Sequence, residues 1–239
     1  MQYELYYWPG IQGRGEFVRL ALEAAGADYA DVARLTGRGK GVDAMMRLMR
    51  DAEREPFAPP FLKAGNLLLA QTANILQYLG PRLGLVPKSE AARLWVHQLQ
   101  LTVTDFVSEI HDTHHPIASS QYYEQQKRAA RERTGHFLGE RLPKYLGYFE
   151  RSIEANASGR GYILGRNLSY VDLSVFQLIA GLRYAFPKTM SRRKRAIPRL
   201  GALHDKVMAH PDLAGYLGSD RRIAFNEDGI FRHYPELER

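Results

Sequence analysis

The spacing of apolar residues changes character near residue 84. Before that point, short apolar runs that favour strands alternate with runs in which apolar residues recur every three or four positions, as on one face of a helix. Strands are predicted at residues 3–8, 29–32, 61–63 and 67–69. Helices are predicted at residues 16–25, 42–53 and 72–79. The last two strands flank Ala64-Gly65-Asn66 and predict a β-hairpin, so the opening third is expected to be an α/β unit.

Beyond Gly84-Leu85-Val86-Pro87-Lys88 the strand patterns fade and helical spacing dominates. This segment and Gly80-Pro81 before it punctuate the chain and together predict a linker. Long helices are predicted at residues 90–115, 121–156, 170–185 and 198–210. The predicted organisation is an α/β domain at 1–84, a linker at 85–89, an all-helical domain at 90–222 and a tail at 223–239 that packs back on the body.

The composition is that of an ordinary globular chain. Of 239 residues, 45% are hydrophobic and 25% are charged, a balance that can build a core and excludes a disordered or fibrous chain. The net charge is +7, and residues 183–222 alone hold 10 basic side chains against 3 acidic ones. This surplus centres on Arg192-Arg193-Lys194-Arg195. A solvated loop before a helix is predicted there, not a nucleic-acid site, because no aromatic residue alternates with the charges.

The chain contains no cysteine, which excludes disulfides, thiolate metal sites, iron–sulfur clusters and a cysteine nucleophile. Its first residues carry neither the basic segment nor the apolar segment of a signal peptide. No apolar run approaches the ~20 residues that a membrane helix needs. We therefore expect a cytoplasmic protein without a membrane partner.

Two short motifs have a direct physical interpretation. Ser169-Tyr170-Val171-Asp172 has the spacing of a capping box, in which each end satisfies an N–H group of the other, and its role is expected to be structural. Gln71-Thr72 lies where a predicted strand turns into a helix. The free N–H groups of such a helix start and the threonine hydroxyl make this position a candidate anion site.

Three separated motifs, taken in order, resemble the cytosolic glutathione S-transferase family over about residues 1–222. They are Tyr7-Trp8 followed by Gly13-Arg14-Gly15-Glu16-Phe17, which is similar to the tyrosine-type classes mu, pi and sigma; Pro60-Phe61-Leu62 through Gly65 to Gln71-Thr72; and Gly165 with Leu168, Ser169 and Asp172. The resemblance implies a thioredoxin-like N-terminal domain of order βαβ-α-ββα, an all-α C-terminal domain, glutathione as co-substrate and a homodimer.

The resemblance also implies that a tyrosine hydroxyl stabilises the glutathione thiolate. Tyr7 is the candidate, and Tyr6 is the fallback because one more residue than in the family pattern separates Tyr7 from Gly13. Successive strand residues face opposite sides, so only one of these tyrosines can point into the cleft. Aromatic packing within the strand is the competing interpretation of both.

Further glutathione contacts follow from the same resemblance. They are Arg14, Lys40, Pro59, Pro60, Gln71, Thr72 and, from the partner subunit, Asp105. Arg38 is an alternative to Lys40, and a cis peptide bond is expected at Pro60. The sequence departs from the family at Pro59, which has no N–H group, so only one of two main-chain hydrogen bonds to the cysteinyl unit can form.

Candidates for the electrophile pocket are Trp8, Ile11 and His114. His111 and His115 are four residues apart and could share a helix face, as the histidines of zincin zinc sites do. No glutamate follows at the required place and no third ligand is evident from the spacing, so a histidine lining without a metal is predicted.

The predicted function is therefore that of a glutathione transferase that conjugates glutathione to small hydrophobic electrophiles in detoxification. The alternative is a protein of the same fold that binds glutathione or hydrophobic ligands without catalysis, which the departure at Pro59 motivates.

Overall fold

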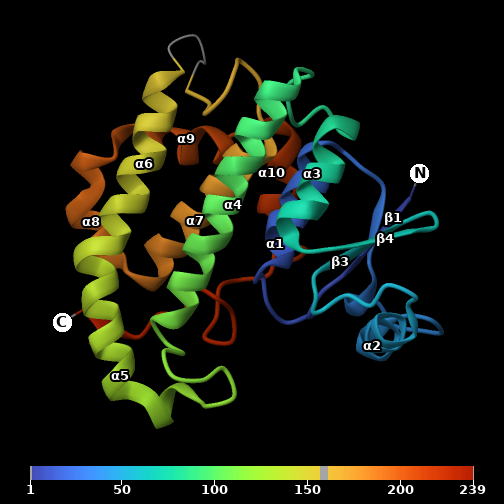
Figure 1. Ribbon diagram of the computed structural model, residues 1–239, viewed down its shortest axis with the longest axis horizontal. Coiled ribbons are helices and arrows are strands. Elements are labelled where there is room, and N and C mark those ends of the chain that lie inside the picture. Colours follow the sequence, from blue (N-terminus) through green and yellow to red (C-terminus); the bar gives the residue numbers. More distant parts are fainter. Residues whose placement is uncertain (1, 157–160, 239) are drawn as a thin grey trace.

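The N-terminal third of the chain builds a four-stranded mixed sheet in the computed structural model, which describes residues 2–156 and 161–238 (Figure 1). The strands are β1 (Tyr3–Tyr6), β2 (Tyr29–Asp31), β3 (Phe61–Ala64) and β4 (Leu67–Ala70). Their order is β2-β1-β3-β4; β1 and β2 are parallel, and the other pairs are antiparallel. Met1 of the predicted first domain and Arg239 of the predicted tail lie outside the described residues.

Helices cover both faces of this sheet. On one face α1 (Gly15–Ala24) and α3 (Thr72–Arg82) bury an apolar layer with β1 and β3. On the other face α2 (Gly41–Asp51) and the short 3₁₀ turn Val32–Arg34 pack over the alternate strand positions. Alternation along β1 and β3 divides the apolar residues between two cores, as strand geometry requires.

The predicted linker at Gly80-Pro81 was wrong, because both residues lie inside α3. Gly80 is needed for contact: a Cβ there would lie 2.7 Å from the Tyr170 ring, so the glycine lets α3 approach the next domain closely. Pro81 leaves only one carbonyl of the preceding turn, that of exposed Gln77, without its helical partner, and water can satisfy it there.

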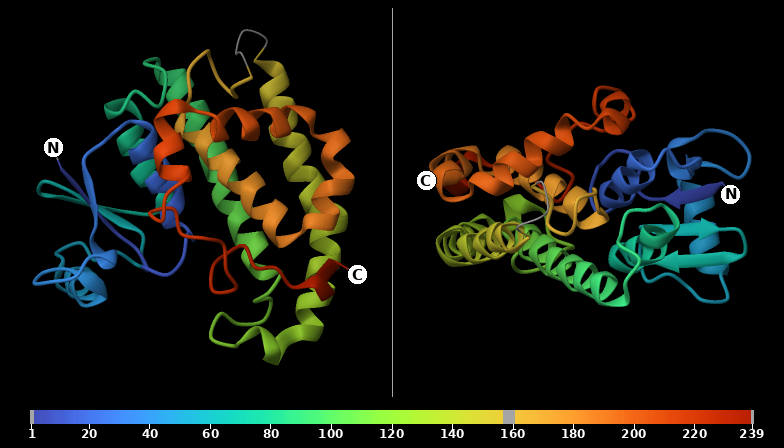
Figure 2. Two further views of the ribbon diagram at one scale, coloured as in Figure 1. Left: turned by 180° about the vertical axis from the view of Figure 1, so that it is seen from behind. Right: turned by 90° about the horizontal axis from the view of Figure 1, so that it is seen from above.

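Helices build the rest of the described chain and pack beside α1 and α3 (Figure 2). Its elements are α4 (Glu90–Asp112), α5 (Tyr123–His136), a π-helical segment (Phe137–Arg141), α6 (Leu142–Ala155), α7 (Tyr170–Ala185), α8 (Pro187–Arg193), a 3₁₀ turn (Lys194–Ala196), α9 (Pro198–Met208), α10 (Pro211–Leu217) and a last 3₁₀ turn (Pro235–Glu238). A sheet covered by helices and then an all-helical region is the predicted fold class: a thioredoxin-like α/β domain followed by a helical domain.

Two features of the helical region differ from the sequence-based expectation. The long helix predicted at 121–156 is interrupted by the π-helical segment, which ends two residues before Pro143, a residue that cannot donate to the preceding turn. The basic run 192–195, predicted as a loop, instead ends α8 and forms the following 3₁₀ turn. Basic side chains favour a helix C-terminus because its free carbonyls carry partial negative charge.

The segment after α10 returns across the molecule toward the first loop (Figure 1). Ile230, Phe231 and Leu237 are buried in the same core as the helices. The Phe231 ring occupies the place where a Cβ at Gly181 would lie, so this glycine of α7 admits the ring. Among the described residues, no helix is long and apolar enough to cross a membrane.

Candidate active site

The two candidate tyrosines face opposite sides of the sheet. Tyr6 packs in the core under α2, stacks on Phe61, and donates its hydroxyl hydrogen to Glu4 Oε2 at 2.5 Å. Burial and the Glu4 carboxylate raise the pKa of the Tyr6 phenol. Tyr7 follows the end of β1 and turns toward the start of α1.

The Tyr7 ring lies directly on the backbone of the Gly13-Arg14-Gly15 segment. Its hydroxyl oxygen accepts a hydrogen bond from the Arg14 N–H at 2.9 Å. A Cβ at Gly15 would lie 2.6 Å from the ring, and one at Gly13 would overlap the hydroxyl. Gly13 also adopts a φ of 46°, which glycine tolerates best. The glycines therefore permit the close approach that places the hydroxyl.

The electrostatics of Tyr7 keep its proton in place. Burial raises the pKa of the phenol, while the Arg14 N–H and the nearby cations of Arg14 and Arg19 act in the opposite direction. The net shift is upward, so the phenol stays protonated at neutral pH. Because the oxygen accepts from Arg14, the hydroxyl hydrogen is left to donate to another group.

Strand register brings three sequence-predicted positions to one edge of the sheet. Tyr6 pairs with Phe61, and Phe61 pairs with Ala70, so the adjoining residues Tyr7, Pro60 and Gln71 follow one another across the same edge. The Pro59–Pro60 peptide bond is cis, as the resemblance predicts.

The start of α3 completes this edge. Gln71, its N-cap residue, has a φ of 68°, a conformation that few residues other than glycine adopt. Thr72 is buried, and its hydroxyl donates to the Arg14 carbonyl at 3.5 Å. This bond joins the start of α3 to the start of α1, so Tyr7, Arg14 and Thr72 form one connected set.

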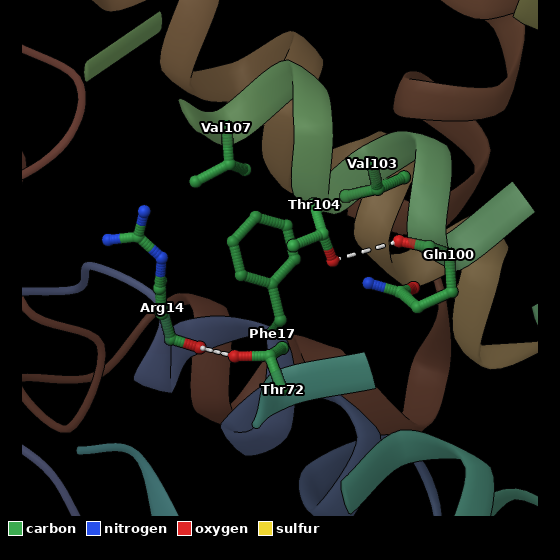
Figure 3. Close-up of a pocket in the computed structure, with 7 residues that line it drawn as sticks. All are labelled: Arg14, Phe17, Thr72, Gln100, Val103, Thr104 and Val107. Carbon is green, nitrogen blue, oxygen red and sulfur yellow. Dashed lines mark hydrogen bonds between the residues drawn. The ribbon is translucent and has the colours of Figure 1, made fainter. Parts of the chain in front are cut away.

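A small hollow lies between this set and α4 (Figure 3). Its lining consists of Arg14, Phe17, Thr72, Gln100, Val103, Thr104 and Val107. In Figure 3 the Arg14 side chain leaves α1 and extends toward the Val107 end of the hollow, and the Phe17 ring lies between the two helices. The hollow thus has polar groups at the α1 and α3 starts, and its α4 wall combines polar Gln100 and Thr104 with apolar Val103 and Val107.

The other predicted site residues lie apart from this hollow. Lys40 is exposed in the loop before α2, and Asp105 is exposed on α4. Of the electrophile-pocket candidates, Trp8 is 41% exposed and Ile11 is half-buried in the first loop. His114 is buried beyond the end of α4.

Three histidines gather at the C-terminal end of α4. One ring nitrogen from each of His111, His114 and His115 lies within 4.8 Å of the others. Burial lowers the pKa of His111 to about 4 and that of His114 to about 2, with the nearby guanidinium of Arg232 contributing to both. Sequence spacing identified His111 and His115 as a pair, and the structure adds His114 as a third nitrogen source.

A buried ionic network behind the site was missed by sequence reasoning. Glu16, at the start of α1, accepts from Tyr216 at 2.9 Å and from Arg222 at 2.8 Å, and it lies 3.5 Å from Arg19. The Arg19 guanidinium also bonds Asp31 at 2.7 Å and lies 5.8 Å from the Tyr7 ring centroid. The sequence feature that could have indicated this network is the presence of two charged residues, Glu16 and Arg19, on an otherwise apolar face of α1.

The fold and the placement of the tyrosine define a class: a thioredoxin-like domain with a hydroxyl group at its sheet edge, joined to a helical domain. Residues 111–220 match the family model described as glutathione S-transferase, C-terminal domain. A glutathione S-transferase of Plasmodium falciparum (isolate 3D7) is 25% identical over 225 residues, which cover 92% of this chain and 97% of that protein. Glutathione S-transferase P 1 of Xenopus laevis is 27% identical, with 92% and 93% covered.

Among solved structures, the chain is similar to a monomeric glutathione S-transferase of the hookworm Necator americanus, with a TM-score of 0.68 and 21% identity, over 95% of this chain and 100% of that one. The structural likeness concerns the fold. The family model and the full-length relatives show that the chain is similar to cytosolic glutathione S-transferases in sequence as well.

Proposed function

We propose that this protein is a tyrosine-type transferase that conjugates the thiolate of glutathione to small hydrophobic electrophiles. The observation that carries the proposal is the Tyr7 hydroxyl, whose oxygen is held by the Arg14 N–H at the sheet edge shared with Pro60 and Gln71. The names of the full-length relatives support the reaction class.

Tyr7 would act as a hydrogen-bond donor to the sulfur. A free thiol has a pKa near 8.5, so little of it is thiolate at neutral pH. The raised pKa keeps the Tyr7 phenol protonated, so its O–H can donate to the charged sulfur and stabilise the thiolate. Tyr7 does not act as the base that removes the thiol proton. Lowering the thiol pKa by about two units requires about 2.7 kcal/mol of preferential stabilisation of the thiolate. The thiol proton passes to solvent, and the thiolate sulfur then forms the new bond to the electrophilic carbon while the leaving group departs with its bonding electron pair, as halide does from an aryl halide.

The start of α3 would hold a carboxylate of glutathione. The first N–H groups of a helix have no helical partners and carry partial positive charge, so they favour an anion. Thr72 lies there, and the Arg14 guanidinium borders the same hollow. Lys40 and Pro59 belong to the same proposal as contacts to the glycyl and cysteinyl units.

The proposal is tested by comparing Tyr7→Phe with Tyr6→Phe. Each change removes one hydroxyl, but the two groups lie on opposite sides of the sheet. We expect Tyr7→Phe to lower turnover of a model aryl halide at least tenfold while calorimetry still detects glutathione binding. Tyr6→Phe is expected to leave turnover nearly unchanged. Equal activity of Tyr7→Phe and the parent protein would contradict the role of Tyr7.

A second candidate function is glutathione or hydrophobic-ligand binding without catalysis. It is favoured by Pro59, which supplies no N–H group next to the cis bond. This function predicts calorimetric binding of glutathione together with no turnover over a broad panel of electrophiles.

We also propose a cytoplasmic homodimer in which Asp105 reaches the site of the other subunit. Asp105 lies on α4 at helical spacing from Leu94 and Leu101, which are 60% and 48% exposed. An exposed apolar stripe that carries the predicted acidic residue supports a subunit interface on this helix. Because the hookworm protein of similar fold is described as monomeric, the dimer needs its own test.

A further inference from the structure

The histidine cluster at the end of α4 is held in a definite geometry. The His114 and His115 Nδ1 atoms are 2.5 Å apart. The ring centroids of His111 and His115 are 4.9 Å apart and nearly parallel, and those of His111 and His114 are 5.0 Å apart. His111 is in the last turn of α4, and its carbonyl accepts from the N–H groups of both His114 and His115. The backbone turn at the end of α4 therefore brings the three imidazole rings close together.

The tautomer of His114 is fixed by a neighbour in the tail. Its Nε2 lies 2.8 Å from the carbonyl oxygen of Ile230. A carbonyl oxygen can only accept, so Nε2 carries the hydrogen, and the Nδ1 of the neutral ring presents a lone pair to the cluster. A ring N–H donated to a backbone carbonyl is the usual way in which a metal-binding histidine is oriented.

The surroundings keep this ring in place. The His114 side chain is 1% exposed, and the Thr113 hydroxyl next to it donates to the Ile110 carbonyl at 2.7 Å. The Thr134 hydroxyl of α5 donates to the Thr113 carbonyl at 3.0 Å. His111 and His115 are only half-buried, so the cluster has one fixed ligand and two that an entering ion can reach.

The nitrogen positions suit one ion. Zinc binds imidazole nitrogen at about 2.0–2.1 Å, which places two nitrogens of a tetrahedral site about 3.3 Å apart. The three nitrogens lie within 4.8 Å of one another, so on binding an ion the closest pair opens by less than about 1 Å and a pair at the upper limit closes by about 1.5 Å.

The ligand types and the charges around the cluster restrict which ions it can bind. The group of potential ligands holds three imidazoles and no carboxylate among the described residues. Imidazole ligands select zinc, copper, nickel or cobalt over magnesium and calcium, which need oxygen ligands. The guanidinium groups of Arg14 and Arg232 act on His111 from nearby. Their positive charge repels a metal dication, and an anion as the fourth ligand reduces this repulsion.

We propose that His111, His114 and His115 form a binding site for one divalent transition-metal ion of the zinc type, with three imidazole ligands and a fourth position open to an anion. Three protein ligands and one open position are typical of metal sites that bind exogenous molecules. The site goes beyond the proposed conjugation reaction, which needs no metal, and its test uses no glutathione.

Cobalt(II) is the probe for the test, because tetrahedral coordination gives it a strong visible absorption band. The full-length protein, without a polyhistidine tag, is treated with a chelator and titrated with Co²⁺ in thiol-free buffer. We expect a visible band that saturates at one equivalent, disappears when Zn²⁺ is added and changes when azide is supplied. A band that ignores azide would contradict the open position.

Matched variants connect the signal to the cluster. His111→Asn and His115→Asn each remove one reachable ligand and are expected to weaken Co²⁺ binding at least tenfold. His136→Asn changes an exposed histidine on α5 and should bind as the parent protein does. Circular dichroism confirms that each variant is folded. No tetrahedral band, or equal affinity in all variants, would overturn the proposal and leave a hydrogen-bonded histidine cluster only.

Discussion

At the scale of single residues, the position of Tyr7 depends on the absence of side chains at Gly13 and Gly15, which lie against its ring. The sequence indicated a tyrosine near the end of the first strand, and strand alternation indicated that Tyr6 and Tyr7 diverge. It did not reveal that Gly13 and Gly15 make room for the ring, because that contact depends on the path of the loop between Pro9 and Gln12. The extra loop residue relative to the family pattern is accommodated without displacing Tyr7 from the start of α1.

The glycine contact predicts that two glycine substitutions differ in their effect on stability. Alanine at Gly15 would favour the helix by up to about 1 kcal/mol, but its Cβ would lie 2.6 Å from a buried ring. The steric overlap with the ring outweighs the gain in helix preference, so Gly15→Ala should lower the free energy of unfolding by about 1–3 kcal/mol. Gly10→Ala, which meets nothing within 4 Å, should change it by less than about 0.5 kcal/mol. Urea denaturation of both variants measures the difference, and equal stabilities would contradict the contact.

At the scale of elements, helix starts were predicted better than helix ends. The start of α7 at Tyr170 follows from local capping: the Ser169 N–H donates to Asp172 Oδ2 at 2.8 Å, and the capping box is complete. The end of α3 was mispredicted because Gly80 is placed for Tyr170, a residue about 90 positions away. Capping residues that act within one helical turn can be recognised from a sequence. A glycine that makes room for a ring distant in the sequence has the same local pattern as a glycine that ends a helix.

The capping box gives a prediction about stability. Ser169→Ala removes a buried cap whose hydroxyl also donates to Asp172 at 2.5 Å, so the free energy of unfolding should fall by about 1–2 kcal/mol. Ser89 caps α4 in an exposed position, where it accepts from the Ala92 N–H at 3.3 Å. Water can replace that bond, so Ser89→Ala should cost clearly less. Thermal and urea unfolding of the two variants test the ranking, which a larger loss for Ser89→Ala would reverse.

At the scale of the whole molecule, the ends of the chain complete the region around the site. The Gln12 side chain donates to the Ile223 carbonyl, and Asn226 donates to the Gly10 carbonyl at 2.9 Å. These bonds join the first loop to the segment that also orients His114. A tail that packs back was expected from its large apolar residues, but these partners could not be identified, because they lie more than 200 positions apart in the sequence.

The proposed dimer predicts restoration of activity in mixed subunits. If Asp105 serves the partner's site, Tyr7→Phe and Asp105→Asn homodimers are each impaired at both sites. A heterodimer of the two variants would contain one site with both changes and one with neither. Refolding an equal mixture should therefore restore part of the turnover of the parent protein. If Asp105 acts within its own subunit, mixing will restore nothing, and light scattering will show whether the protein dimerises.

The buried ionic network has a consequence for the timing of synthesis. Glu16 leaves the ribosome about 200 residues before Tyr216 and Arg222, which satisfy its carboxylate. Asp31 can pair with Arg19 early, but Glu16 has to stay hydrated until the last helix arrives. The helix beneath the Tyr7 ring is therefore translated well before the partners that bury its carboxylate, so ribosome-bound chains that lack α10 and Arg222 should hold this site open.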